Sequence, residues 1–126
     1  MTKRNLLRLA LSLCAAAAPV GALAHATHGQ PQHGGIVAEA GVFQGELVAR
    51  GGRLVIHLSE HGHPLPAKGA KGRLTLVIQG QQQELELRPG RDNTLQAAGA
   101  WPPGARATAT ITLADGLSGV LRFEAK

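Results

Sequence analysis

The strongest constraint on the fold is a two-residue alternation of polar and apolar side chains late in the chain. Between residues 108 and 113, three threonines alternate with an alanine, an isoleucine and a leucine. Successive side chains of a strand point to opposite faces, so this spacing predicts a strand with one buried face. Similar short runs recur from Ile36 onward, separated by turn residues at intervals of roughly ten residues. This pattern predicts an all-β domain.

We expect a small immunoglobulin-like β-sandwich of about seven or eight strands over residues 36–126. The paired glycines Gly51-Gly52 supply the positive φ of a tight turn, so the runs on either side of them should form a hairpin. A long loop is expected over 61–72. The expected strands are 35–38, 43–49, 53–59, 74–78, 84–88, a short one near Leu95, 108–113 and 120–124.

The first 24 residues have the features of a secretory signal peptide. Lys3 and Arg4 precede an apolar run from Leu6 to Val20, and Ala22-Leu23-Ala24 is a cleavage motif. The run is shorter than the roughly 20 residues of a membrane-spanning helix, so no transmembrane segment is expected in the mature chain. Cleavage after Ala24, or alternatively after Ala26, predicts a periplasmic protein with a flexible, histidine-containing arm over 25–35.

The loss of the leader changes the charge and the cysteine content. It removes three of the 13 Lys and Arg residues but none of the eight acids, which leaves a net charge of about +2. No basic block is interleaved with aromatics, so nucleic-acid binding is not expected. Cys14 lies within the leader and is removed with it. It would be retained only in a lipoprotein, and Leu13 before it disfavours lipidation. The mature chain therefore has no thiol for catalysis or metal binding.

Histidine is the residue type that points to chemistry. All six histidines lie between His25 and His63, mostly in segments rich in glycine or proline. Imidazole is the commonest transition-metal ligand in proteins. His61 and His63 would project to the same side if the backbone between them were extended. The alternative is a solvated loop with two incidental polar residues.

Three further residues are candidates for the same site. His33 precedes Gly34-Gly35, which lets a neighbouring element approach closely, but it could equally be a linker residue. His57 faces away from the core side chains of its strand, where a histidine on a solvated sheet face is the more common case. Glu46 faces away from the core too, so it could be a ligand, a support for a histidine ligand, or one half of an ordinary cross-strand pair.

His25 and His28 could form a separate tail site, in which a free α-amine and an imidazole chelate Cu(II) or Ni(II), or they could belong to an unstructured tail. With neither cysteine nor methionine in the mature chain, Cu(I) is disfavoured, and imidazole and carboxylate suit Cu(II), Zn(II) or Ni(II). No nucleophile elbow or phosphate-binding glycine pattern is present, so we do not expect an enzyme.

The order of four short pieces resembles a known group of proteins. These pieces are His33-Gly34-Gly35-Ile36-Val37, Phe43-Gln44-Gly45-Glu46-Leu47-Val48, Gly52-Arg53-Leu54-Val55-Ile56-His57-Leu58 and His61-Gly62-His63-Pro64-Leu65. They are similar to small bacterial periplasmic proteins and to the segment that opens the periplasmic adaptor (membrane-fusion) subunits of heavy-metal efflux pumps. The chain departs from that pattern at His57 and Gly45, where aromatic residues are common, and it lacks the long helical hairpin of an adaptor.

The resemblance implies a periplasmic β-domain linked to heavy-metal handling. We therefore expect a protein that binds one Cu(II) or Zn(II) ion mainly through His33, His61 and His63, with Glu46 or His57 nearby. Its role would be that of an accessory to heavy-metal resistance or efflux, with an efflux adaptor or another periplasmic protein as partner. The alternative is a periplasmic protein–protein interaction module whose histidines are incidental.

Overall fold

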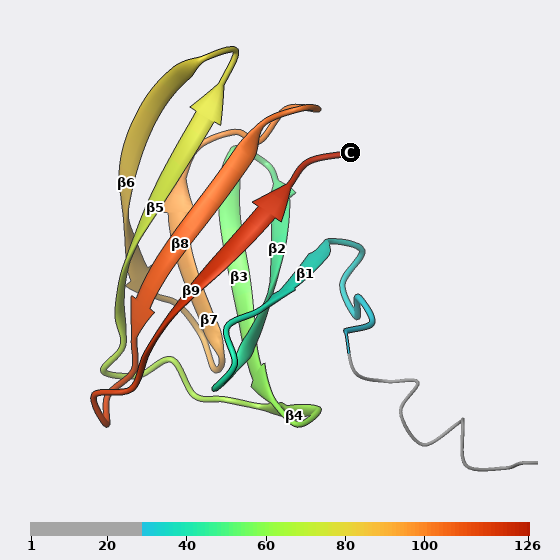
Figure 1. The fold of residues 1–126 in the computed structure, drawn as a ribbon. Helices are drawn as coiled ribbons and strands as arrows, with labels where there is room; N and C mark the ends of the chain where they lie inside the picture. Colours follow the sequence, from blue (N-terminus) through green and yellow to red (C-terminus); the bar gives the residue numbers. More distant parts are fainter. Residues whose placement is uncertain (1–28) are drawn as a thin grey trace, which may run out of the picture.

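A computed structural model of the protein describes residues 29–126 (Figure 1). Over this range the chain forms nine strands and no helix, so the described part has no helix that could cross a membrane. The expected leader, 1–24, lies outside the described residues, as do His25 and His28. The strands are β1 (Ile36–Glu39), β2 (Gln44–Arg50), β3 (Arg53–Glu60), β4 (His63–Pro64), β5 (Lys71–Ile78), β6 (Gln81–Pro89), β7 (Thr94–Ala98), β8 (Arg106–Thr112) and β9 (Ser118–Glu124).

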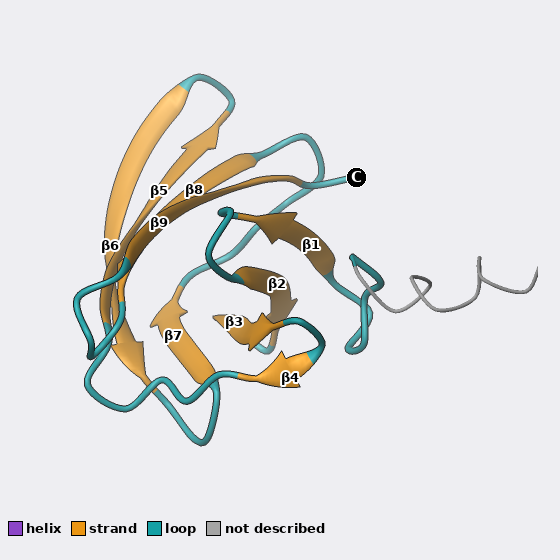
Figure 2. Ribbon diagram, turned by 60° about the horizontal axis from the view of Figure 1, so that its bottom comes forward, coloured by secondary structure: helices purple, strands orange, loops and turns teal. Residues whose placement is uncertain are grey.

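The strands form one antiparallel sheet that curls on itself. Their order is β1-β2-β3-β7-β6-β5-β8-β9, and β4 pairs separately with β3. β1, at one end of this order, lies against β9 at the other end, so the sheet nearly closes into a barrel (Figure 2). β6 and β7 are joined by two register pairs, Arg88 with Gln96 and Pro89 with Leu95. The predicted all-β class is confirmed. The two layers of the small sandwich belong to one continuous sheet, in which only these two pairs connect β6 to β7.

The alternation in the sequence determines which face of each strand is buried. On β8, Ala107, Ala109 and Ile111 are buried while the threonines between them face outward. On β3, Leu54, Ile56 and Leu58 are fully buried, as their spacing predicts. Leucine, isoleucine and alanine make up most of the core. Because His57 lies between Ile56 and Leu58, it emerges on the opposite face of β3.

The absence of a side chain at Gly45 is explained by the closure of the sheet. A Cβ placed on Gly45 would lie 2.7 Å from Cδ1 of Leu121 and 2.9 Å from Cγ2 of Ile56. Leu121 belongs to β9 and is fully buried. The interior beside Gly45 is therefore filled by Leu121 from β9.

The region after β3 differs from the sequence prediction. Instead of a loop that runs without interruption from residue 61, β4 folds back on β3 and pairs His63 with Glu60 and Pro64 with Ser59. The turn between the two strands is His61-Gly62, whose φ angles are +50° and +82°. Two-residue hairpin turns of type I′ have positive φ at both central positions, as here. The extended backbone that would send His61 and His63 to one side is therefore absent, and that premise was wrong.

Candidate functional site

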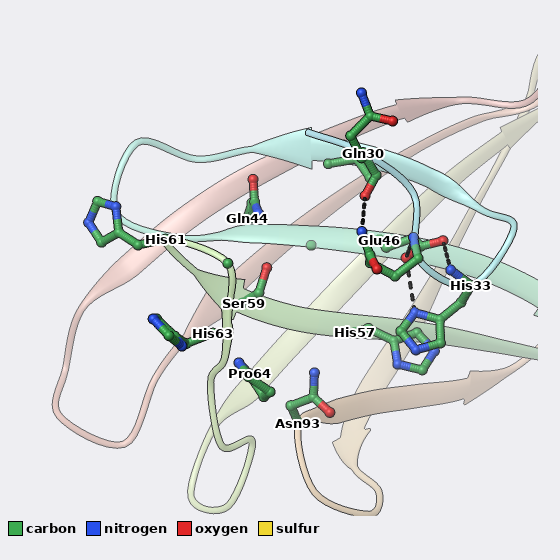
Figure 3. A pocket seen from close by; sticks show the side chains of 14 residues that line it. Gln30, His33, Gln44, Glu46, His57, Ser59, His61, His63, Pro64 and Asn93 are labelled. Carbon is green, nitrogen blue, oxygen red and sulfur yellow. Dashed lines mark hydrogen bonds and ion pairs between the residues drawn. The ribbon is translucent and has the colours of Figure 1, made fainter. Parts of the chain in front are cut away.

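An open cavity of about 670 Å³ lies over the outer face of β2 and β3, beside the β3–β4 turn. Four histidines line it, together with one carboxylate, Glu46 (Figure 3). The remaining polar lining is neutral, and no lysine or arginine of the described chain lines this cavity. The histidines are His33, His57, His61 and His63, and the neutral polar side chains are Gln30, Gln32, Gln44, Ser59 and Asn93.

The strand register places Glu46 beside His57. Glu46 on β2 is the direct cross-strand partner of His57 on β3 and of Val37 on β1. All three line the cavity. Glu46 faces away from the core, as its position in the strand predicts, yet it is only 5% exposed. The segment 32–35, just before β1, lies over Glu46 and shields it from solvent. This segment also donates hydrogen bonds to the Glu46 carboxylate.

The Glu46 carboxylate binds this segment through four hydrogen bonds. Its Oε2 accepts from the backbone N–H groups of His33 at 2.8 Å and Gly35 at 2.7 Å. Its Oε1 accepts from the backbone N–H of Gln32 at 2.9 Å and lies 3.0 Å from Nδ1 of His33. Both carboxylate oxygens are therefore used twice, which compensates for the burial of a charged group.

Gly34 and Gly35 make this arrangement possible. Gly34 has a φ of +77°, a backbone conformation that residues with a Cβ rarely adopt. At Gly35 a Cβ would collide with the carbonyl oxygen of Leu47 and would lie 2.8 Å from Cγ2 of Val48. The close approach expected at this glycine pair is confirmed. It brings three backbone N–H groups and one imidazole to a single carboxylate.

Burial and hydrogen bonding act in opposite directions on the pKa of Glu46. Burial raises it, because a carboxylate loses solvation away from water. Hydrogen bonds from the Gly35 backbone, the His33 side chain and the Gln32 and His33 backbones lower it. The hydrogen bonds prevail, so the pKa of Glu46 lies below its ordinary value of 4.5 and the group is ionised at neutral pH.

The imidazole of His33 stacks on that of His57. The two ring centroids are 3.6 Å apart and the ring planes are within 5° of parallel. Burial lowers the pKa of His57 below its ordinary value of 6.5, and the neighbouring His33 lowers it further. Glu46 opposes this shift without reversing it. Sequence reasoning placed His57 on the outer face but gave no sign of this contact, because His33 lies outside any strand.

His61 and His63 lie at the other end of the cavity. His61 occupies the β3–β4 turn and His63 begins β4. Both line the cavity, yet Figure 3 shows them well away from the stacked pair, with His61 at the outer rim. The structure therefore unites His33 with Glu46 and His57, and it does not bring His33 together with His61 and His63. Within 29–126, no group of three or more His, Cys, Asp or Glu side chains is arranged to hold a metal ion.

Several lining residues were not identified from the sequence. Gln30 and Gln32 enter the cavity because the segment before β1 folds back over β2, and no local pattern indicates such a path. Asn93 reaches it from the turn before β7, where its side-chain amide donates to the Leu58 carbonyl at 2.8 Å. The Gly34-Gly35 pair was the one available signal that this segment approaches another strand.

Comparison with known proteins gives no further assignment: no protein-family model, curated protein or solved structure matches this chain.

Proposed function

We propose that the protein is a periplasmic protein that binds a divalent transition metal, Cu(II) or Zn(II), and acts as an accessory to heavy-metal resistance or efflux. The observation that carries this proposal is the bond between His33 Nδ1 and the buried Glu46 carboxylate. Histidines that bind metals commonly donate their second ring N–H to a carboxylate, which fixes the tautomer and the ring orientation. His33 is held in this way.

The His33–Glu46 pair leaves one coordinating atom available. When Nδ1 carries the proton that it donates to Glu46, Nε2 is unprotonated and has a lone pair for a metal. The side chain of His33 is 46% exposed, whereas that of Glu46 is 6% exposed. The imidazole can therefore meet an ion from the cavity, while Glu46 acts behind it as a positioning residue.

The charge of the cavity also favours a cation. Its ionised carboxylate is not opposed by any lysine or arginine among the described lining residues. The remaining lining supplies imidazoles and neutral oxygens, which suit borderline metals such as Cu(II) and Zn(II).

Export to the periplasm and the link to heavy-metal handling depend on the sequence. The leader over 1–24 supports export. The resemblance of about residues 33 to 66 to efflux-adaptor segments supports the accessory role, with such an adaptor as the partner. The alternative, an interaction module with incidental histidines, applies if the exported protein binds no metal.

Calorimetric titration of the exported protein with Zn(II) and Cu(II) tests the proposal. We expect one bound ion with a dissociation constant of micromolar order, which corresponds to a binding free energy of about −8 kcal/mol. His33→Ala should weaken binding at least tenfold, or about 1.4 kcal/mol, and the double change His61→Ala with His63→Ala should weaken it less. Glu84→Gln, at an exposed position on β6 outside the cavity, is the control and should leave affinity unchanged. If the dissociation constant is no tighter than about millimolar, which corresponds to a binding free energy of roughly −4 kcal/mol, the proposal of metal binding is rejected.

A further inference from the structure

The β2–β3 hairpin ends in two arginines that lie opposite each other. Arg50 on β2 and Arg53 on β3 are direct cross-strand partners, and both are exposed. Like charges directly opposite each other on neighbouring strands destabilise a sheet. Strand pairing therefore gives no reason for this arginine pair, which points to a role in binding.

No nearby carboxylate compensates for the two positive charges. Neither member of the arginine pair forms an ion pair with a carboxylate of residues 29–126. On the outer face of β2, β3 and β7, the one carboxylate is Glu46, and its oxygens already accept from four donors. Arg53 instead donates to the neutral side chain of Gln96 at 3.1 Å. Both guanidinium groups thus present an uncompensated charge to solvent.

The backbone holds the arginine pair in a defined place. Gly51 and Gly52, which form the turn between the two arginines, both have positive φ. The carbonyl of Gly52 accepts from the N–H of Gly99 at 3.0 Å, which ties the turn to the chain that follows β7. The Cα positions of both arginines are therefore set before a partner arrives, and this reduces the entropy lost on binding.

The arginine pair lies on the same face as the cavity, at the other end of the hairpin. Residues 46, 48 and 50 of β2, like residues 57, 55 and 53 of β3, alternate onto this outer face. At about 3.4 Å per residue, the pair lies about 14 Å along the strands from Glu46 and His57. Figure 1 shows the β2–β3 turn at the opposite end of these strands from β4. A partner bound to the arginine pair would lie beside the cavity, not within it.

Carboxylates suit the arginine pair. A planar guanidinium group binds a carboxylate through two parallel hydrogen bonds. Cross-strand neighbours have Cβ atoms about 5 Å apart, and an extended peptide with acidic residues at positions i and i+2 presents two carboxylates on one side, about 7 Å apart. Sites for anionic membranes use clusters of about four to eight basic residues, whereas the end of this hairpin carries two. An acidic protein segment is therefore the fitting occupant.

We propose that the arginine pair is the docking point for an extended acidic segment of the partner protein, with Asp or Glu at alternate positions. The inference rests on the proposed function for the role of that partner and deepens it, because it gives the surface and the chemistry of the contact. Docking at this end of the hairpin leaves the cavity open, so a bound ion and a docked partner can be present together.

The test titrates the metal-free exported protein with a capped nonapeptide of alternating glutamate and threonine, followed by ¹H–¹⁵N chemical shifts at low salt. We expect a dissociation constant below about millimolar, with the shifts concentrated at residues 48–55, and no measurable binding of the same peptide with glutamine in place of glutamate. Arg50→Gln together with Arg53→Gln should weaken binding at least about fivefold.

The matched control is Arg106→Gln together with Arg122→Gln. It removes the same charge from exposed positions on β8 and β9, and peptide affinity should stay within about twofold of the wild type. Equal losses in the two double variants would mean that the peptide responds to net charge alone, which overturns the inference. Variants without Arg50 and Arg53 should be at least as stable as the wild type to urea, because a like-charge pair is removed.

The remaining outcomes separate this inference from the proposed function. A wild-type protein that binds Zn(II) but not the glutamate peptide overturns the docking point alone. Peptide binding by a wild-type protein that binds neither Zn(II) nor Cu(II) overturns the proposed metal binding and leaves the docking point standing. Arginine-dependent binding to vesicles of phosphatidylcholine and phosphatidylglycerol, without binding of the peptide, identifies a membrane contact and overturns the docking of a protein segment.

Discussion

At the scale of single residues, the geometry of the cavity depends on Glu46. This one carboxylate holds the segment 32–35 against β2, orients His33 and lies opposite His57 in the register. The burial of this charge is compensated because both carboxylate oxygens accept hydrogen bonds. Removal of the carboxylate would be costly, because four hydrogen-bond donors would lose their acceptor.

Substitution of Glu46 tests this dependence. Glu46→Gln keeps the shape but places an NH₂ group where an oxygen accepts from N–H donors. We expect a loss of about 1–3 kcal/mol in the free energy of unfolding, measured by urea denaturation. Metal affinity should fall roughly 10- to 100-fold, as when such a support is removed from a ligand histidine. Glu84→Gln, at an exposed position on β6, should change stability by less than about 0.5 kcal/mol.

The dependence of stability on pH follows from the same residues. The folded state lowers the pKa of Glu46 below 4.5, so its contribution is fully present above about pH 4.5 and is lost as the pH falls through the folded value. The pKa of His57 is lowered from 6.5, so the folded protein resists its protonation and stability declines as the pH falls below 6.5. Both effects have the same sign.

Urea denaturation between pH 7.5 and 3.5 should therefore show stability decreasing with acid. His57→Gln should flatten the part of the profile just below pH 6.5, and Glu46→Gln the part below 4.5. A wild-type protein that gained stability on acidification from pH 6.5 to 5 would contradict the environment described for His57.

The sequence predicted part of this arrangement and could not predict the rest. The alternation within 43–49 placed Glu46 on the outer face, and hairpin pairing placed it near His57. Its burial depends on a segment 11 to 14 residues away that has no periodicity. The stacking of His33 on His57 depends on the same segment, so neither contact could be derived from local pattern.

At the scale of elements, alternation located the strands well wherever their apolar faces are buried. β2, β3, β8 and β9 lie within two residues of the expected ranges. β4 was missed because a strand of two residues is too short to show an alternating pattern. β6 was expected to be shorter because it begins with three exposed glutamines. The turn at His61-Gly62 was missed because the first of its two positive-φ positions is not a glycine, and positive φ is uncommon for residues other than glycine.

The docking of the segment before β1 can be tested through Gly35. In Gly35→Ala, the new Cβ would collide with the Leu47 carbonyl, so residues 32–35 should move off Glu46. We expect a loss of about 1–3 kcal/mol in stability, the usual cost of overpacking, together with weaker metal binding and faster amide exchange at Gln32 and His33. In the control Gln32→Ala, the backbone N–H that Glu46 accepts remains, so stability and exchange should match the wild type.

At the scale of the whole molecule, the cavity combines segments that are distant in the sequence. Its lining comes from the segment before β1, from β1 to β4, and from Asn93 before β7. On the inner side of the sheet, Leu121 of β9 fills the space opposite Gly45. The sequence predicted a β-domain with histidines at several turns. It could not predict which of them meet, because the strand register and the path of the segment before β1 are set by long-range packing.

The most direct measurement of the central claim is a long-range ¹H–¹⁵N correlation spectrum of the histidine rings, recorded with and without Zn(II). Without metal, we predict that the neutral ring of His33 carries its proton on Nδ1, toward Glu46. With Zn(II), the Nε2 resonance of His33 should shift while Nδ1 stays protonated. If Zn(II) instead left the His33 ring unchanged, or shifted only the resonances of His61 and His63, the account of His33 as the metal ligand would be contradicted.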